Sequence, residues 1–232
     1  MNKNAWNLWS VIIVTVAIVA SVHAYGPQDG KIVRKVPTTH KVVAFTFDDG
    51  PHPGTTPELL ALLKEKEVKA TFFILGRNGE TNLALLKEVI AAGHEIGNHG
   101  YSHQFLRQMG MDRYLADVKR NEDLLNQFGV KTNLFRPPGG GYNDNLVATL
   151  QQKGYTTVMW SVDTRDWSRP AVDQVVKVAT DHLEPGAIFL FHDGQHDLPT
   201  VKAVRILIDR FREQGYSIVT VGDLLLYEEM RH

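Results

Sequence analysis

Short apolar runs alternate with amphipathic stretches along most of this 232-residue chain. The short runs are rich in β-branched and aromatic residues, which is typical of buried strands. They occupy residues 41–47, 70–75, 94–97, 134–135, 156–162, 187–191 and 217–221. The amphipathic stretches carry apolar residues at helical spacing, and several are followed by a glycine that can serve as a C-cap. They occupy residues 83–92, 112–128, 144–153, 171–182, 199–214 and 223–229, and a further helix begins near Thr55.

Strand and helix alternate about seven times, which predicts βαβ units and a parallel sheet. At this length a closed or nearly closed barrel is favoured, and a doubly wound open sheet is the alternative. In a barrel, the loops that follow the strands share one face, and that face carries the chemistry. The sequence therefore predicts that seven polar residues found just after strands converge: Asp48, Asp49, His99, His103, Arg136, Asp166 and His192.

The N-terminal segment differs from the rest of the chain. Residues 8–22 are mostly apolar after Lys3, and Ala24 ends a Val-His-Ala sequence of the kind that signal peptidases cleave. We expect residues 1–24 to be an export signal or an uncleaved membrane anchor, residues 25–40 a linker, and residues 41–232 the folded domain. The domain would then be extracellular, associated with the cell wall or anchored to the membrane, and would contact a membrane only through the N-terminal segment.

Composition narrows the range of partners and cofactors. The formal net charge is −1, so bulk electrostatics give no reason to expect a nucleic-acid partner. The chain has no cysteine, which excludes disulfides and thiolate metal sites. Any metal must therefore be held by histidine, aspartate or glutamate.

Two adjacent carboxylates, Asp48 and Asp49, follow the first strand, and Gly50 and Pro51 end it. A polar turn would explain these residues if they stood alone. Neighbouring carboxylates repel each other, however, and a site that keeps both ionised usually supplies a cation. The spacing leaves open which of the two would meet that cation.

His99 and His103 stand four residues apart, a spacing that puts both imidazoles on one side of a helical turn. Pairs of surface histidines also show this spacing. Here Asp49 is available as a third ligand, and two imidazoles with one carboxylate leave metal positions open, as in hydrolytic zinc sites. We expect zinc, with iron or another divalent ion as the alternative. The second aspartate could then take a proton from the attacking water.

Arg136, Asp166 and His192 could complete a hydrolytic site. Arg136 can orient a carboxylate, and the glycines that follow its two prolines leave backbone N–H groups open to an oxyanion, although a stiff polar turn is the simpler explanation. A histidine at the end of an apolar strand is usually a core residue, but His192 could also donate a proton to a leaving amine. Asp166 is a candidate for the carboxylate that would raise the pKa of His192. Trp167 could wall a sugar pocket, although core packing explains most tryptophans.

Five segments carry these residues, in the order ThrPheAspAspGlyPro (46–51), HisGlyTyrSerHis (99–103), ArgProProGlyGly (136–140), AspThrArgAspTrp (163–167) and LeuPheHis (190–192). Together they resemble the motifs of the polysaccharide deacetylase family, the NodB-type domain of carbohydrate esterase family 4. The resemblance covers residues 41–221. It implies a distorted (β/α)7-type barrel and a metal-dependent hydrolase that removes acetyl groups from N-acetylated glycans.

The resemblance also implies roles for single residues. Asp48 matches the catalytic base, and Arg136 matches the residue that orients it. Asp49, His99 and His103 match the metal ligands. His192 matches the general acid, and Asp166 matches the carboxylate that tunes it. The remaining matches concern the substrate: Gly139 stands where the family provides an oxyanion N–H group, and Trp167 and Leu190 match walls of the acetyl pocket.

Three positions depart from the family pattern. Gly100 stands where serine or threonine is usual, so a hydroxyl that braces the loop is lost. Gln104 replaces a frequent proline, and Gly139 replaces a frequent tyrosine. None of these changes removes a catalytic atom, but they bear on substrate preference and turnover.

The expected substrate is the N-acetylglucosamine of peptidoglycan, followed by chitin oligosaccharides and acetylated xylan. This order rests on the expected export and on the resemblance. One rival function is a non-catalytic glycan-binding module, which would need neither Asp48 nor His192. Another is a glycosidase, which two barrel carboxylates could support but which would leave the histidine pair unexplained.

Overall fold

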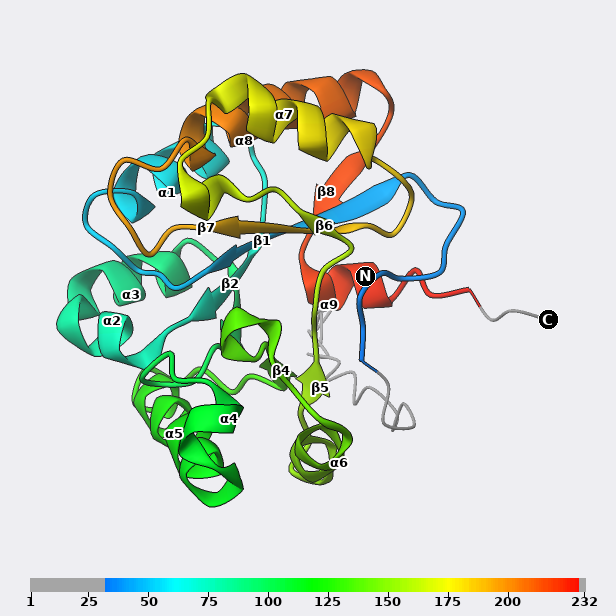
Figure 1. Cartoon of the computed structure of the whole chain (residues 1–232). Coiled ribbons are helices and arrows are strands. Elements are labelled where there is room, and N and C mark those ends of the chain that lie inside the picture. The colour runs from blue at the N-terminus through cyan, green and yellow to red at the C-terminus, as the bar shows by residue number, and fades with distance from the viewer. Residues whose placement is uncertain (1–31, 230–232) are drawn as a thin grey trace, which may run out of the picture.

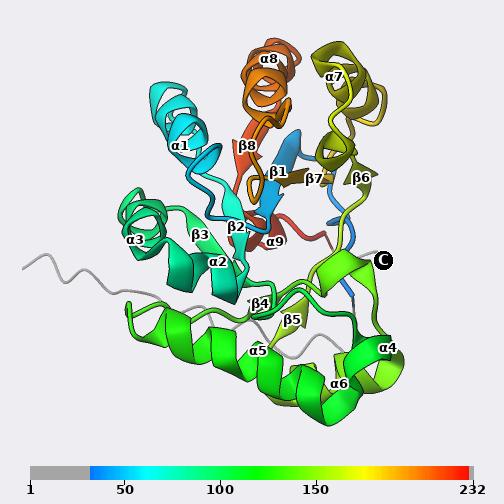
Figure 2. The ribbon, with the colours of Figure 1, turned by 60° about the vertical axis from the view of Figure 1, so that its left-hand side comes forward.

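The computed structural model describes residues 32–229, in which a curled sheet of parallel strands is surrounded by helices (Figures 1 and 2). The strands are β1 (Val42–Asp48), β2 (Thr71–Ile74), β3 (Glu95–Asn98), β4 (Leu134–Phe135), β5 (Thr156–Thr157), β6 (Val162–Asp163), β7 (Ile188–His192) and β8 (Ser217–Val219). The α-helices are α1 (Thr56–Glu65), α2 (Gly76–Thr81), α3 (Leu83–Ala91), α4 (Leu106–Met109), α5 (Met111–Asn126), α6 (Asp144–Gln152), α7 (Val172–Asp181), α8 (Thr200–Glu213) and α9 (Val221–Leu225). Two short 3-10 helices are η1 (Pro138–Gly140) and η2 (Asp166–Ser168).

Strand β1 pairs with three other strands, β2, β7 and β8. The strand order is β5-β4-β3-β2-β1-β7-β6, and β8 pairs with the first half of β1. Strands β5 and β6 lie at opposite ends of this order, and the four residues 158–161 connect them. The predicted parallel, distorted α/β barrel is therefore confirmed, and it is curled rather than closed by strand pairing.

The single strand predicted over residues 156–162 is wrong. Its two ends form β5 and β6, and the middle leaves the strand ladder. The carbonyl groups of Val158 and Met159 in this middle part accept hydrogen bonds from the side chain of Arg136. The side chain of Arg136, from another loop, thus occupies backbone carbonyls that a continuous strand would use for pairing. No local sequence pattern predicts this contact.

Helices α2 and α4 were also not predicted. The α2 segment contains two glycines and no apolar stripe, so its sequence favours a loop. The helix forms because the N–H groups of Gly76 and Arg77 donate to the carbonyls of Gly100 and Tyr101. These contacts satisfy two of the N–H groups that every helix start leaves without an internal partner.

Part of the segment expected as a linker belongs to the folded domain. Val33 and Val36 are buried, and Val33 and Lys35 form isolated β-bridges with Val158 and Ala187. Residues 1–24, expected as a signal or anchor, lie outside the described residues, as do residues 25–31. Among residues 32–229, no helix is long and apolar enough to span a bilayer.

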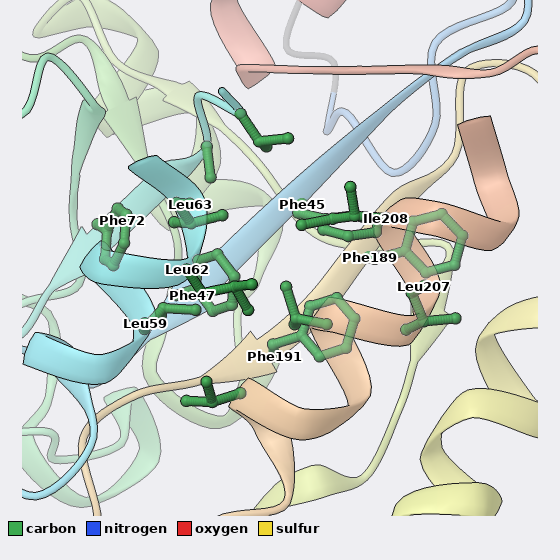
Figure 3. Packing of buried hydrophobic residues seen from close by; sticks show 14 of the residues in the cluster. Phe45, Phe47, Leu59, Leu62, Leu63, Phe72, Phe189, Phe191, Leu207 and Ile208 are labelled. Carbon is green, nitrogen blue, oxygen red and sulfur yellow. The ribbon is translucent and has the colours of Figure 1, made fainter. Parts of the chain in front are cut away.

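Alternate residues of β1 and β7 belong to two different parts of the core. Phe45 and Phe47 of β1 pack with Phe189 and Phe191 of β7 beneath leucines of α1 and α8 (Figure 3). Each buried phenylalanine contributes strongly to stability, since truncation to alanine typically costs about 3–5 kcal/mol. Side chains alternate between the two faces of a strand, so the residues between these phenylalanines face the barrel interior.

Candidate active site

Strand register brings the carboxyl ends of β1 and β7 together on the interior side of the barrel. In their parallel pairing, Thr46 stands opposite Leu190 and Asp48 stands opposite His192. Neighbouring residues in a parallel ladder point their side chains to the same face. The two strands therefore present a carboxylate and an imidazole side by side at the barrel mouth.

Asp48 is paired with Arg136, which directly follows the last residue of β4. The Nη1 atom of Arg136 lies 2.7 Å from Oδ1 of Asp48, and both side chains are buried. The second carboxylate oxygen, Oδ2, lies 3.7 Å from Nε2 of His99. One oxygen of Asp48 is thus held by the arginine, and the other faces the histidines.

The guanidinium of Arg136 is held in place by several hydrogen bonds and by an aromatic ring. Besides Asp48, it donates to Oγ1 of Thr46 at 2.7 Å and to the carbonyls of Val158 and Met159 at 3.2 and 2.9 Å. It also lies over the ring of Phe73, 4.1 Å from the ring centroid. Burial lowers the pKa of Arg136, and the charge and hydrogen bond of Asp48 act against this shift. The many donors that arginine offers make it suited to hold a carboxylate in one orientation.

Asp49, His99 and His103 form the one group of potential metal ligands found among the described residues. One oxygen or nitrogen from each side chain lies within 4.8 Å of the others. Oδ1 of Asp49 is 3.4 Å from Nε2 of His99 and 3.2 Å from Nε2 of His103. Asp49 has a φ of 72°, so the backbone turns sharply between the two aspartates and separates their side chains.

The chemistry of these three donors fits a divalent cation. Nδ1 of His99 lies 2.8 Å from the carbonyl oxygen of Arg136, to which it donates as an N–H group. This tautomer leaves Nε2 as a lone-pair donor toward Asp49. Oδ1 of Asp49 is buried and lacks a hydrogen-bond partner within the described chain. Burial acts to raise the pKa of Asp49, but whenever the two imidazoles are protonated, their N–H groups and charges outweigh burial and hold this pKa well below its ordinary value. A buried anionic oxygen between two imidazole nitrogens is a donor set that zinc and similar ions bind.

His192 and Asp166 form a second pair, in which Asp166 is fully buried and His192 is partly buried. Nδ1 of His192 lies 2.8 Å from Oδ1 of Asp166, which also accepts a hydrogen bond from the backbone N–H of Trp167. Oδ2 of Asp166 accepts from the backbone N–H of His192 and from Oγ1 of Thr200. Burial lowers the pKa of His192, but the hydrogen bond and charge of Asp166 outweigh it and raise this pKa to about 9.

Asp193 is a buried acid that the sequence reading missed. Its Oδ2 accepts a hydrogen bond of 2.6 Å from Oγ1 of Thr56, and its backbone N–H donates to the carbonyl of Asp48. Burial raises the pKa of Asp193 to about 7, and the charges of Asp49 and Asp48 act in the same direction. A signal was present, because His-Asp-Gly ends β7 as Asp-Asp-Gly ends β1.

The three predicted substrate contacts lie in different surroundings. Leu190 is buried on β7, whereas Trp167 leaves 47% of its surface exposed beside Asp166. Gly139 has a φ of 61°, and a Cβ atom there would lie 2.5 Å from Cε1 of Phe105. Phe105, which no pattern identified, also packs its ring edge against His103 with ring centroids 6.0 Å apart. The ring of Phe105 thus covers the position where the family often has a tyrosine.

Comparison with known proteins decides the family. The sequence profile described as "Polysaccharide deacetylase" matches residues 35–158, more than half of the chain. The chain belongs to the polysaccharide deacetylase family. The predicted family is thereby confirmed.

Two curated relatives are similar over most of their own length. A peptidoglycan-N-acetylglucosamine deacetylase of Bacillus cereus is 38% identical over 202 residues, which cover 86% of this chain and 95% of the relative. A chitooligosaccharide deacetylase of Sinorhizobium fredii is 37% identical over 190 residues, which cover 76% and 88% of the two chains. These matches confirm the predicted enzyme class, a hydrolase that removes acetyl groups from polysaccharides.

Solved structures of family members share the fold. The Bc1960 peptidoglycan N-acetylglucosamine deacetylase, solved with 4-naphthalen-1-yl-N-oxidanyl-benzamide, has a TM-score of 0.82 at 33% identity and covers 86% of this chain and 95% of its own. A family pseudoenzyme from Bacillus anthracis has a TM-score of 0.79 at 30% identity, with 84% and 69% covered. A mutant of that pseudoenzyme is described as having restored activity. Because the same fold can lack catalysis, the case for activity in this chain depends on its individual residues.

Proposed function

We propose that this protein removes the N-acetyl group from N-acetylglucosamine residues of peptidoglycan, with zinc held by Asp49, His99 and His103. The observation that carries the proposal is that two separate charge pairs lie beside these donors. Asp48, held by Arg136, faces His99, and His192, held by Asp166, stands opposite Asp48 in the pairing of β1 with β7. Peptidoglycan is the favoured glycan because the Bacillus cereus relative, which this chain covers almost completely, carries that name.

The proposed role of the cation follows from the chemistry of its three donors. A divalent ion bound there would polarise the acetyl carbonyl and make a nearby water more acidic. Two imidazoles and one carboxylate leave coordination positions open for substrate and water. Zinc is the default for this donor set.

Asp48 is the proposed general base. Its Oδ1 is occupied by Arg136, so its Oδ2, which faces His99, is the oxygen available to take a proton from the attacking water. A base held in one orientation by a buried arginine loses little freedom when the reaction begins. General base catalysis of this kind typically contributes about 10² to 10⁴ in rate.

His192 is the proposed general acid. Its Nδ1 is committed to Asp166, which leaves Nε2 to donate a proton to the departing amine. With a pKa of about 9, His192 carries this proton at neutral pH. After proton transfer, the products are acetate and a free amino sugar, which balances the addition of one water across the amide bond.

The remaining residues would stabilise and shape the reacting acetyl group. In our proposal the backbone N–H group of Gly139 donates to the oxyanion, and Leu190 and Trp167 flank the acetyl methyl. The exposed ring of Trp167 supports a ligand-facing position, since it contributes little to the core.

A groove beside Gly139 supports a polymeric substrate. Its volume is about 770 Å³, and Phe105, Leu106, Met111 and Tyr142 line it with apolar surface while asparagine side chains add polar groups. Sugars present both apolar faces and hydroxyl groups, so a wall of this mixed kind suits a neighbouring sugar of the glycan.

The proposed location follows the proposed substrate. Peptidoglycan lies outside the cytoplasmic membrane, and the apolar residues 8–22 have the composition of an export signal or anchor. We propose that the domain is exported and works at the cell wall, either released or tethered through residues 1–24.

Chitin oligosaccharides are the second candidate substrate, because the Sinorhizobium fredii relative is named for them. Acetylated xylan is the third. The deciding experiment incubates purified protein and zinc with peptidoglycan, chitin oligosaccharides and acetylxylan, and measures the acetate released. We expect the fastest release from peptidoglycan. A preference for chitin oligosaccharides or xylan would reassign the substrate, and a glycan that binds without any acetate release would make the protein a binding module.

A further inference from the structure

The three residues between the two histidine ligands form a loop that is hydrogen-bonded at each backbone N–H group. The N–H of Gly100 donates to Oδ1 of Asn98 at 2.8 Å. The N–H groups of Tyr101 and Ser102 both donate to Oδ2 of Asp117, at 2.7 and 3.2 Å. One carboxylate oxygen, supplied by helix α5, thus holds two successive residues of the loop, and the second of them directly precedes His103.

The carbonyl side of the same loop is held from the opposite direction. The carbonyls of Gly100 and Tyr101 accept hydrogen bonds from the N–H groups of Gly76 and Arg77 at the start of α2, at 2.9 and 3.0 Å. The loop is therefore clamped between α2 and α5. Of these contacts, the one from Asp117 is made by a charged side chain, and hydrogen bonds to an ionised acceptor are about twice as strong as neutral ones.

Helix α5 is itself locked to the sheet beside this loop. The side-chain amide of Asn121 donates to the carbonyl of Ile74 and to Oδ1 of Asn98, and Asn98 donates to the carbonyl of Val118. Asn98 and Asn121 are fully buried. Asp117 therefore holds the loop from a rigid support.

Gly100 makes room for this arrangement. It has a φ of 72°, and a Cβ atom added to it would lie 3.0 Å from Oδ2 of Asp117. At position 100 this chain lacks the hydroxyl that is usual in the family, and Oδ2 of Asp117, on α5, lies close to that position instead.

The two histidines depend on the loop to different degrees. His99 is buried and bonded through Nδ1 to the carbonyl of Arg136. His103 leaves 29% of its side chain exposed, and its backbone takes a φ of 61°, which is costly for a residue with a side chain. We propose that Asp117 is a positioning residue that holds His103 in the orientation that binds the metal. This inference rests on the cation site of the proposed function.

Zinc affinity is the direct test, because it needs no catalysis. Purified metal-free protein is titrated with zinc in competition with a chromophoric chelator, for the wild type, Asp117→Ala and Asp117→Asn. We expect Asp117→Ala to raise the Kd for zinc about tenfold, the low end of losses seen when outer partners of metal ligands are removed. Asp117→Asn keeps an oxygen that accepts from both N–H groups, so we expect its Kd to stay within about threefold of wild type. Asp123→Ala is the matched control, since Asp123 lies on the same helix and pairs with Lys119 at the surface.

Unchanged zinc affinity in Asp117→Ala would overturn the inference, as would a loss in Asp117→Asn as large as in Asp117→Ala. If the alanine variant does not fold, hydrogen exchange of the backbone amides tests the inference instead. We expect slow exchange at Tyr101 and Ser102 in metal-free wild type. In Asp117→Asn we expect faster exchange at these two amides, because the neutral amide oxygen is a weaker acceptor than the carboxylate, and unchanged exchange along α5. Exchange at solvent-exposed rates in the wild type would refute the proposal. A wild type that binds no zinc at all would instead refute the cation site itself.

Discussion

The site contains two charge pairs, Asp48 with Arg136 and His192 with Asp166. In the two pairs the charges of the supporting residue and of the residue that faces the site are reversed. In the first, a fully buried arginine holds one oxygen of an aspartate and leaves the other oxygen toward the histidines. In the second, a fully buried aspartate holds one nitrogen of a histidine and leaves the other nitrogen available. The supporting member of each pair makes additional hydrogen bonds. Arg136 donates to the carbonyls of Val158 and Met159, and Asp166 accepts from the hydroxyl of Thr200.

In our proposal this difference gives opposite tasks to the two halves of the site. Where the fixed partner is a cation, the aspartate facing the site has one oxygen bound by the guanidinium and a second oxygen that can accept a proton. Where the fixed partner is an anion, the histidine facing the site stays protonated and is suited to give one. Strand pairing places Asp48 opposite His192, so the acceptor and the donor are neighbours in one ladder.

Replacing the base should have the largest effect on turnover. Asp48→Asn keeps the size of the side chain and an oxygen for Arg136 but removes the proton acceptor. We expect the rate of acetate release to fall by about 10² to 10⁴, with zinc affinity close to that of wild type because Asp49, His99 and His103 remain. Asp209→Asn, on an exposed surface pair with Lys66, is the control and should keep full activity. Wild-type turnover in Asp48→Asn would show that Asp48 is not the base.

Removing the supporting cation should destabilise the fold as well as the site. Arg136→Met leaves Asp48 buried without its partner, and breaking a buried pair from one side typically costs about 3–5 kcal/mol. Urea unfolding monitored by circular dichroism measures this loss. Arg205→Met removes an exposed arginine that pairs with Glu65 and should change the free energy of unfolding little. Equal losses in the two variants would contradict the special role of the buried pair.

Removing the supporting anion should change the pH profile. His192 acts as an acid only while protonated, so kcat/KM should fall as the pH rises through the pKa of His192 near 9. Asp166→Asn removes the charge that raises this pKa. The alkaline limb of the kcat/KM profile should therefore move to lower pH in the variant. An unmoved limb would mean that His192 is not the acid or that Asp166 does not tune it.

The smallest expected effect concerns Trp167. Nearly half of its surface is exposed, so Trp167→Ala should leave the free energy of unfolding almost unchanged. If the ring flanks the substrate, KM for glycans should rise several-fold, in line with the loss of one aromatic contact worth about 0.5–1.5 kcal/mol. Unchanged KM and kcat would remove Trp167 from the substrate pocket.

Most strands, and the grouping of the candidate site residues after them, could be predicted because their signals are local. Phe45 and Phe47 mark β1 as buried, and the polar residues that follow strands fall on one face whatever the precise strand order. The roles of Asp48 and Asp49 could not be divided from sequence spacing. The difference between them comes from the φ of Asp49 and from the approach of Arg136, which is 88 residues away from Asp48 in the chain.

The features that sequence reasoning missed depend on contacts between distant segments. The interruption at residues 158–161 arises because Arg136 takes two backbone carbonyls. Asp117 reads as one polar position on an amphipathic helix, and only the packed structure shows that it accepts the N–H groups of Tyr101 and Ser102. Helical periodicity tells which face of α5 is polar, but not which neighbouring segment that face holds.

We propose that Asp49, His99 and His103 hold a cation on which acetate release depends, between Asp48 as the base and His192 as the acid. The most direct test is the rate of acetate release from peptidoglycan before exhaustive chelation, after it, and after zinc is restored. We predict a rate that falls to background on chelation and returns with about one zinc ion per protein. Undiminished acetate release from the metal-depleted protein would contradict the account.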